Sequence, residues 1–457
     1  MKKGAMKFTA VAVLLSTALA GCGGGSGATN AGEAPKTESP KNEAPKAEAP
    51  KAENFAITLR HINVRDTAKN TLALLEKVVA KTKTDVPGLD VKLDGVEDTV
   101  NRDVKLKAEM AAGKPPQIFN LFGGADTANY AKAGHLLPLN DILKELGLED
   151  KFMDLREFTV DGKIYGLPES GYVEGFFYNT KLFADAGITA APKTWEEFLK
   201  ACEALKAKGI VPIALGGGAG DGWAINMLGN ALFVAYAGPE SQEGFSKGSA
   251  KWTDTGVVEG FKKLKELKDK GYIDANVLGL KYSEGQAKFY TGQAGMLFDG
   301  TWAANAILDK EKSKVHENVG FFTVPAVGGK GDGFVNGGWS NGYGFSAHLN
   351  DNEKKAVKAF IKNFYTLDNQ AEALGRDRRI PSMKGVPTPA DSHALMKSIG
   401  EAQAKAKGAF PAFDALVQPK VKVTLEQSAQ ELLGGQITPE KLAEKMQKVQ
   451  EEANAGK

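Results

Sequence analysis

A proline recurs at every fifth position near the start of the chain and decides where folded structure can begin. The repeats read Glu-Ala-Pro-Lys or Glu-Ser-Pro-Lys and contain Pro35, Pro40, Pro45 and Pro50. Proline disrupts helices and central strands alike, and this stretch has almost no large apolar side chains whose burial would offset the entropy of ordering. We therefore expect residues 22–53 to form an extended tether. At about 3.1 Å per residue, its roughly 30 residues would reach on the order of 90 Å.

Residues 1–21 have the composition of a secretory signal peptide. Three lysines precede an apolar run at residues 8–20, which is too short to span a bilayer and is typical of the apolar core of a signal. The run ends in Leu-Ala-Gly-Cys22, which resembles the lipobox of bacterial lipoproteins. The resemblance implies cleavage before Cys22 and a diacylglycerol on its thiol. An ordinary signal peptide followed by a chance cysteine is the alternative.

The net charge and the cysteine content limit which partners and which disulfides this chain can have. The formal charge of the 457-residue chain is +2, and loss of the three lysines of the signal segment lowers it to −1. This balance lacks the basic excess of a nucleic-acid-binding protein, so we expect no nucleic acid as partner. If Cys22 carries a lipid, Cys202 is the one cysteine left in the sequence and no intrachain disulfide can form.

The part that follows the tether, about 400 residues, is too large for one ordinary core and indicates two domains. Short β-rich runs at residues 56–61, 91–93, 117–121 and 210–215 alternate with segments of helical spacing. Thr194 and Glu197 are spaced as a capping box, and Cys202 lies on the apolar stripe of the helix that they would start, which makes it a core residue. This alternation predicts an α/β fold with largely parallel sheets.

Catalytic motifs are weak in this sequence. The five histidines lack metal-ligand spacing. Residues 338–342 fit the G-x-S-x-G pattern around Ser340, but a nucleophile elbow needs a strand before it and a helix after it, whereas a turn and then a strand are predicted here. The Gly-rich run at residues 216–222 lacks the Lys and Ser/Thr of a phosphate loop, and Asp221 would repel phosphate. We expect no catalysis, no metal and no cofactor; a secreted hydrolase that uses Ser340 is an alternative.

Aromatic residues beside predicted glycine turns point to binding instead. Trp223 follows the Gly-rich run, Trp302 follows Asp299-Gly-Thr, and Trp339 follows Asn336-Gly-Gly. A flat indole can cover the apolar face of a sugar ring, and Asp, Asn, Glu and Arg can bind its hydroxyl rim. Core packing is an equally good explanation for any single tryptophan.

Several stretches carry a family resemblance in the right order along the chain. Residues 161–168 read Asp-Gly-Lys-Ile-Tyr-Gly-Leu-Pro, 177–183 read Phe-Tyr-Asn-Thr-Lys-Leu-Phe, and 192–198 read Pro-Lys-Thr-Trp-Glu-Glu-Phe. Residues 292–296, Gly-Gln-Ala-Gly-Met, lead to Asp-Gly-Thr-Trp at 299–302. Together they resemble the extracellular solute-binding proteins (family 1) of carbohydrate ABC transporters, the group that includes maltose-binding proteins.

This resemblance implies a two-lobe, periplasmic-binding-protein-like fold of type II, in which each lobe is a sheet flanked by helices. The lobes would be discontinuous and joined by a hinge, with the ligand in the cleft between them. We expect the signal peptide at residues 1–21, the tether at 22–53, lobe 1 at 54–171 and 343–382, and lobe 2 at 172–342 and 383–457.

The resemblance also implies which segments face the cleft. The candidate ligand-binding residues are His61, Asn63, Arg65, Asp66, Asn120, Phe122, Tyr172, Glu174, Asp221, Trp223, Asp299, Trp302, Asn336, Gly338, Trp339 and Arg379. Several family members have a tryptophan after the first or third strand where this chain has His61 and Phe122, so the identity of the sugar stays open.

The expected function is capture of a carbohydrate, with an oligosaccharide favoured because the aromatics come from several segments, and its delivery to an ABC permease. We expect a monomer, anchored through its lipid on the extracellular face of a membrane in a Gram-positive source, or in the periplasm of a Gram-negative one. Two alternatives keep the fold: a polyamine ligand held by Asp66, Glu174, Asp221 and Asp299, or a sensor partner of a membrane kinase.

Overall fold

The computed structural model describes residues 53–65, 68–218, 220–390 and 392–456. The predicted signal peptide, nearly all of the tether, Cys22 and Asp66 therefore lie outside the described residues. Within them, no helix has the length and apolar character needed to cross a membrane.

The centre of the described unit is a ten-stranded mixed sheet, whose main path runs β2-β1-β3-β10-β6-β8-β7. Its strands are β1 (Phe55–His61), β2 (Leu89–Gly95), β3 (Ile118–Phe122), β6 (Gly166–Asn179), β7 (Val211–Ala214), β8 (Ala294–Gly300), β9 (Val319–Phe322), β10 (Phe334–Phe345), β11 (Ile380–Pro381) and β12 (Gly408–Phe410). A separate hairpin pairs β4 (Thr159–Val160) with β5 (Lys163–Ile164). β1 pairs in parallel with β2 and β3, whereas β6 and β10 pair antiparallel with each other and with most of their neighbours. The prediction of largely parallel sheets is therefore wrong for the centre.

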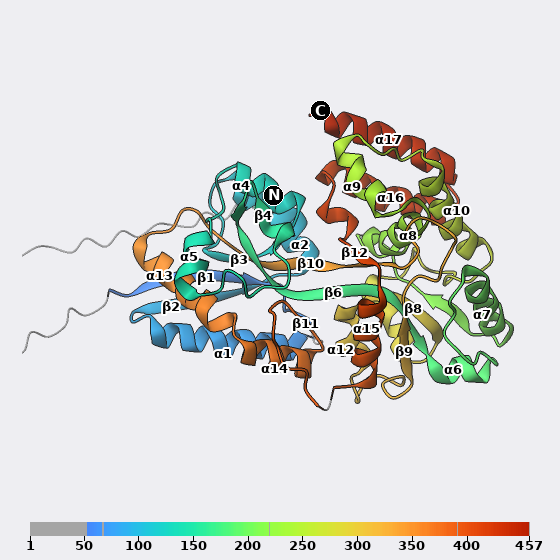
Figure 1. Ribbon diagram of the computed structural model, residues 1–457, viewed down its shortest axis with the longest axis horizontal. Helices are drawn as coiled ribbons and strands as arrows, with labels where there is room; N and C mark the ends of the chain where they lie inside the picture. Colours follow the sequence, from blue (N-terminus) through green and yellow to red (C-terminus); the bar gives the residue numbers. More distant parts are fainter. Residues whose placement is uncertain (1–52, 66–67, 219, 391, 457) are drawn as a thin grey trace, which may run out of the picture. The chain divides into compact units, whose positions relative to one another are not determined.

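Buried apolar residues fall into two groups of clusters, which we call the first and the second lobe. The buried core residues of the first lobe come from 57–167 and 343–383, and those of the second lobe from 173–335 and 395–446. The long strands β6 and β10 run from one lobe into the other (Figure 1). Their pairing has register shifts between Gly338 and Gly342, so the sheet is irregular where the chain crosses.

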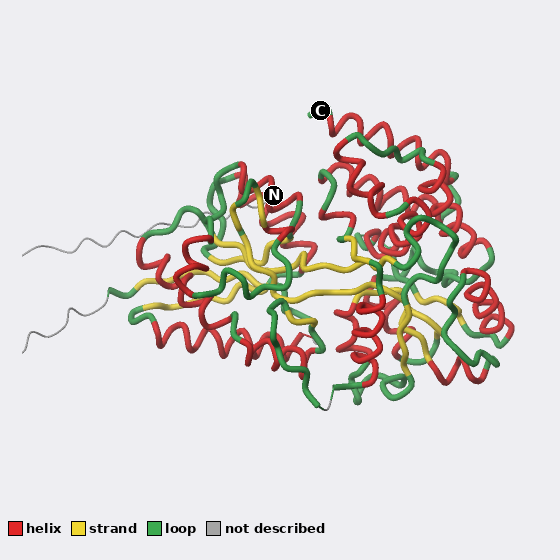
Figure 2. The backbone as a smooth tube through the Cα atoms, in the orientation of Figure 1, coloured by secondary structure: helices red, strands yellow, loops and turns green. Residues whose placement is uncertain are grey.

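Helices flank the sheet in both lobes (Figure 2). Those of the first lobe are α1 (Lys69–Asp85), α2 (Asp98–Val100), α3 (Leu106–Ala111), α4 (Ala125–Lys132), α5 (Asn140–Leu146), α13 (Asp351–Phe364) and α14 (Leu367–Asp377). Those of the second lobe are α6 (Thr180–Asp185), α7 (Trp195–Ala207), α8 (Gly222–Ala237), α9 (Pro239–Lys247), α10 (Thr255–Asp269), α11 (Tyr282–Tyr290), α12 (Ala304–Ile307), α15 (Ala394–Lys405), α16 (Pro419–Leu433) and α17 (Pro439–Asn454).

The local signals of α7 are confirmed. Thr194 accepts from the Glu197 backbone N–H, and the Glu197 carboxylate accepts from the Thr194 backbone N–H, which completes the capping box. Cys202 on this helix is fully buried in the core of the second lobe.

The prediction of a glycine turn before Trp339 is wrong. Residues 336–338 lie inside β10, where a Cβ on Gly337 would meet the Tyr172 carbonyl oxygen at 2.9 Å. Gly216, in the run after β7, is packed in a similar way, because a Cβ there would lie 2.1 Å from the Lys281 carbonyl oxygen. In both places glycine allows a second backbone segment to pack closely.

Candidate ligand-binding cleft

A cleft with a volume of about 730 Å³ lies between the two lobes and is lined by residues of both. This is within the range of about 300–1,000 Å³ that small-molecule sites occupy. Nine of the residues predicted from the sequence line it: Asn63, Arg65, Phe122, Tyr172, Glu174, Trp223, Trp302, Asn336 and Arg379. Segments far apart in the sequence therefore meet at one surface.

Other predicted residues lie behind the lining, and several of them support it. Asn120 donates to the side chain of Asn341, which does line the cleft, over 2.6 Å. His61 is buried at the end of β1, where its Nδ1 accepts from the Asn63 backbone N–H. Asp221 accepts from the backbone N–H of Tyr282 over 2.9 Å. The remaining ones are Asp299, Gly338 and Trp339.

Trp302 presents an exposed aromatic face to the cleft. Its side chain is 45% exposed, which is unusual for so large an apolar group. The other face of the indole lies against Gly300, where a Cβ would stand 2.2 Å from the ring. Tyr172 lies beside it, with ring centroids 5.7 Å apart. The wall therefore offers an aromatic surface of the kind that stacks on a sugar ring.

A buried polar cluster holds this ring in place. The Trp302 indole N–H donates to the Tyr282 hydroxyl over 2.8 Å, and Tyr282 donates in turn to Asp299 at 3.0 Å. Gln286 donates to the same carboxylate over 2.8 Å. Asp299 is fully buried, and this burial raises its pKa to about 7 despite its hydrogen bonds. Tyr282 and Gln286 were missed by the sequence analysis, since neither has a local signal.

Two arginines of the lining, Arg65 and Arg379, have acidic partners in the wall. Arg65 donates to Glu97 over 2.6 Å, and its guanidinium lies 5.7 Å from the ring centroid of Tyr282 on the opposite lobe. Arg379 pairs with Glu169 at 2.9 Å, and both side chains are largely buried. Because both guanidinium groups already have acidic partners, neither needs an anionic ligand to balance its charge.

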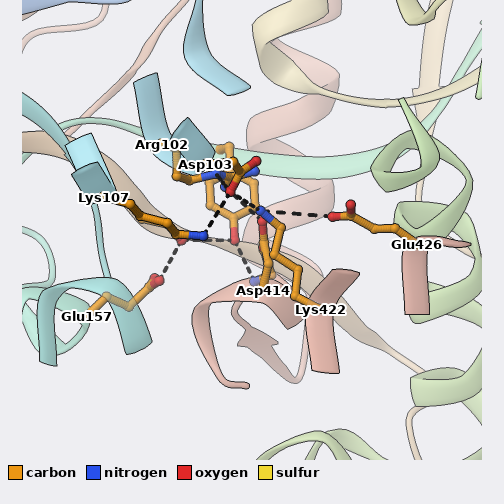
Figure 3. A network of polar contacts seen from close by, with 10 residues as sticks. Arg102, Asp103, Lys107, Glu157, Asp414, Lys422 and Glu426 are labelled. Carbon is orange, nitrogen blue, oxygen red and sulfur yellow. Dashed lines mark hydrogen bonds and ion pairs between the residues drawn. The ribbon is translucent and has the colours of Figure 1, made fainter. Parts of the chain in front are cut away.

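An ion network joins the lobes at one part of the cleft (Figure 3). Arg102 of the first lobe donates to Asp414 of the second over 2.8 Å, and Lys422 of the second lobe pairs with Asp103 of the first at 3.0 Å. The Arg102 and Asp414 side chains are 10% and 18% exposed, and both residues line the cleft. Arg102 and Asp414 are 312 positions apart, so no local sequence pattern predicts their contact.

Ser340, the centre of the G-x-S-x-G match, belongs to the crossing strand β10. Its hydroxyl donates to Glu157 over 2.5 Å and lies 3.4 Å from the Tyr172 hydroxyl, which accepts from the Ala412 backbone N–H over 2.7 Å. Burial raises the pKa of Glu157 to about 7. Because residues 338–342 lie within one strand, they lack the strand–turn–helix geometry of a nucleophile elbow.

The described residues contain no group of three or more His, Cys, Asp or Glu side chains placed to hold a metal ion.

Helix α8 contributes four residues to the cleft lining: Trp223, Asn226, Met227 and Asn230. The two asparagines interrupt an otherwise apolar helix, which is a signal that the sequence did contain.

Comparison with known proteins agrees with this arrangement. A family model described as bacterial extracellular solute-binding protein matches residues 67–371. The multiple sugar-binding protein of Streptococcus mutans is 28% identical over 341 residues, which are 72% of this chain and 76% of the relative. The diacetylchitobiose binding protein DasA of Streptomyces coelicolor is 28% identical over 294 residues, 63% of this chain and 64% of the relative, so just under two thirds of its length is matched.

A solved structure described as a chitin oligosaccharide binding protein is more similar. It is 81% identical, its match covers 89% of this chain and 100% of that chain, and the TM-score is 0.88. The two-lobe α/β fold predicted from the sequence is therefore confirmed.

Proposed function

This chain belongs to the bacterial extracellular solute-binding protein family, and we propose that it captures an oligosaccharide of N-acetylglucosamine for an ABC transporter. The observation that carries this proposal is the cleft of about 730 Å³, whose wall contains the exposed face of Trp302. The 81% identity to a chitin oligosaccharide binding protein supports the choice of sugar, because chitin is a polymer of N-acetylglucosamine.

The acidic side chains speak against a polyamine. Burial raises the pKa of Glu174 well above its ordinary value and that of Asp299 to about 7, because ionising a buried carboxyl costs free energy. Asp221 accepts a hydrogen bond from the Tyr282 backbone N–H. These three of the acids predicted to hold a polyamine are therefore buried or already hydrogen-bonded, which favours a neutral ligand over a cation.

Binding rather than catalysis is the proposed activity. Relatives with the same family match are solute-binding proteins, and the Ser340 hydroxyl is bonded to Glu157 and Tyr172 rather than to a histidine. Turnover of an ester substrate that is lost in Ser340→Ala would contradict this part of the proposal.

The lobes, anchor and partners complete the proposal. We place the lobes at residues 54–171 with 343–382 and at 172–342 with 383–457, a division supported by the distribution of the two sets of core clusters. The signal peptide, the lipid on Cys22, the tether, delivery to a permease and a monomeric state remain part of the same proposal. Lipid labelling of the wild type that is lost in Cys22→Ser, with release of the protein from the membrane, tests the anchor.

Isothermal titration of the purified chain tests the ligand. The panel contains oligomers of N-acetylglucosamine, glucose and xylose, together with spermidine. A ligand that binds only the folded state also raises the unfolding midpoint. At a ligand concentration of 100 times Kd, it increases the free energy of unfolding by about 2.7 kcal/mol. Tight binding of the N-acetylglucosamine series supports the proposal, and binding restricted to another sugar or to spermidine contradicts it.

A further inference from the structure

Two buried asparagines on α8 have side-chain atoms without hydrogen-bond partners among the described residues. Asn226 and Asn230 are 7% and 1% exposed, and both line the cleft. The Oδ1 of Asn226 and both the Oδ1 and the Nδ2 of Asn230 are unpartnered. A spacing of four residues puts the two amides on the same face of the helix.

A third amide, on the crossing strand β10, lines the same cleft. Asn336 donates to Glu174 over 2.6 Å, while its Oδ1 has no partner among the described residues. Glu174 is buried, and burial raises its pKa well above the ordinary value because it disfavours the charged carboxylate. Both residues line the same cleft. The wall around α8 therefore presents uncharged amide donors and acceptors.

Unpaired amides in a buried wall cost free energy unless a ligand or water supplies their partners. An acetamido group offers one N–H donor, one carbonyl acceptor and a methyl group. The Asn Oδ1 atoms match the donor, the Asn230 Nδ2 matches the carbonyl, and Met227, which also lines the cleft on α8, offers apolar contact for the methyl. A ring hydroxyl would leave the methyl-sized apolar contact unfilled.

We propose that Asn226 and Asn230, with Asn336, form a subsite for the acetamido group of an N-acetylated sugar. This subsite distinguishes N-acetylglucosamine oligomers from glucose oligomers of the same length. The inference rests on the proposed function, because it assigns one group of that ligand to one part of the same cleft.

The test replaces each amide by an apolar side chain of similar volume, Asn226→Leu and Asn230→Leu, in the full chain. Isothermal titration then gives the Kd values of the wild type and both variants for chitotriose and cellotriose. We expect chitotriose affinity to fall at least tenfold in each variant, and its ratio to cellotriose affinity to fall with it. The unfolding midpoints should be equal to or above that of the wild type, because an unpaired buried polar group is removed.

A matched control removes an unpaired polar atom elsewhere. Ser428 on α16 is fully buried, its hydroxyl has no partner among the described residues, and it does not line the cleft. Ser428→Ala should leave both Kd values unchanged.

The outcomes separate the inference from the function on which it rests. A wild type that binds no N-acetylglucosamine oligomer overturns the proposed function and this inference with it. A wild type that binds chitotriose, with leucine variants whose Kd lies within twofold of it, overturns the inference alone. Loss of chitotriose and cellotriose affinity by the same factor also overturns it, because the amides would then contact groups that the two sugars share.

Discussion

Trp302 donates its indole N–H to the hydroxyl of Tyr282 over 2.8 Å, so a half-exposed ring is oriented by a residue from a different helix. Tyr282→Phe keeps the packing of the ring against Trp223 but removes this acceptor together with the hydrogen bond that the hydroxyl donates to Asp299. We expect sugar affinity to fall severalfold, because the indole loses a hydrogen bond that contributes about 1 kcal/mol to its orientation. Isothermal titration measures the effect. Tyr236→Phe, on the same lobe but outside the cleft lining, is the control, and an equal effect in both variants would contradict the prediction.

Gly300 sets how close the indole lies to β8. A Cβ at this position would stand 2.2 Å from the Trp302 ring, so Gly300→Ala must displace the ring from its place in the wall. We expect at least a tenfold loss of sugar affinity, since a displaced aromatic anchor typically costs about 2 kcal/mol. Gly400→Ala is the matched control, because nothing lies within 4 Å of a Cβ there. Isothermal titration of both variants measures the two affinities, and an unchanged Kd in Gly300→Ala would contradict this prediction.

The ion pair between Arg102 and Asp414 joins the two lobes where both residues line the cleft. Asp414→Asn removes the nearer of two acidic partners of a largely buried guanidinium, the other being Asp103 at 3.9 Å, and costs about 2 kcal/mol at this partial exposure. An arrangement in which the lobes make this contact loses that stabilisation relative to one in which they do not, so we expect about tenfold weaker binding and faster release of sugar. Stopped-flow tryptophan fluorescence and titration measure the two effects.

An exposed ion pair provides the control for that prediction. Glu196 pairs with Lys200 on α7, and the two side chains are 78% and 73% exposed. Glu196→Gln should leave Kd and the release rate unchanged, because exposed ion pairs contribute little and this one lies outside the cleft lining. Equal behaviour of Asp414→Asn and Glu196→Gln would show that the lobe-joining pair does not bias closure.

Local signals in the sequence predicted local structure well. Thr194 and Glu197 predicted the start of α7 because a capping box depends on residues three apart, and the apolar stripe of that helix predicted the burial of Cys202. The residues after the first and third strands, Asn63 and Phe122, were predicted to face the cleft through family resemblance, and both line it.

Relationships between distant segments were not predictable in the same way. Asn336-Gly-Gly was read as a turn because glycine favours turns, whereas the glycines serve the close packing of two crossing strands. Tyr282 looks like any tyrosine in a helix, and only the fold brings its hydroxyl to Trp302. The Arg102–Asp414 pair joins two residues 312 positions apart, and no local pattern in the sequence indicates such a contact.

Cys202 should resist chemical modification in the folded protein. It is fully buried in the core of the second lobe, and burial raises the pKa of its thiol, so the reactive thiolate is suppressed. In a chain that carries Cys22→Ser, we expect a maleimide to label Cys202 about a hundredfold more slowly in buffer than in 8 M urea. Mass spectrometry follows the reaction, and native labelling at the rate of a free thiol would contradict the buried position.

The Glu157 carboxyl should make the free energy of unfolding depend on pH. Burial raises its pKa from 4.5 to about 7. A carboxyl whose pKa is higher in the folded state contributes stability that is complete below its unfolded pKa and is lost as the pH rises through its folded pKa. We expect the unfolding free energy of the wild type to fall, relative to that of Glu157→Gln, by about 2–3 kcal/mol between pH 5 and pH 8. Urea unfolding at each pH measures this difference. Glu196→Gln, at an exposed site, should follow the wild type throughout, and a flat difference for Glu157→Gln would mean that the buried carboxyl does not titrate in this range.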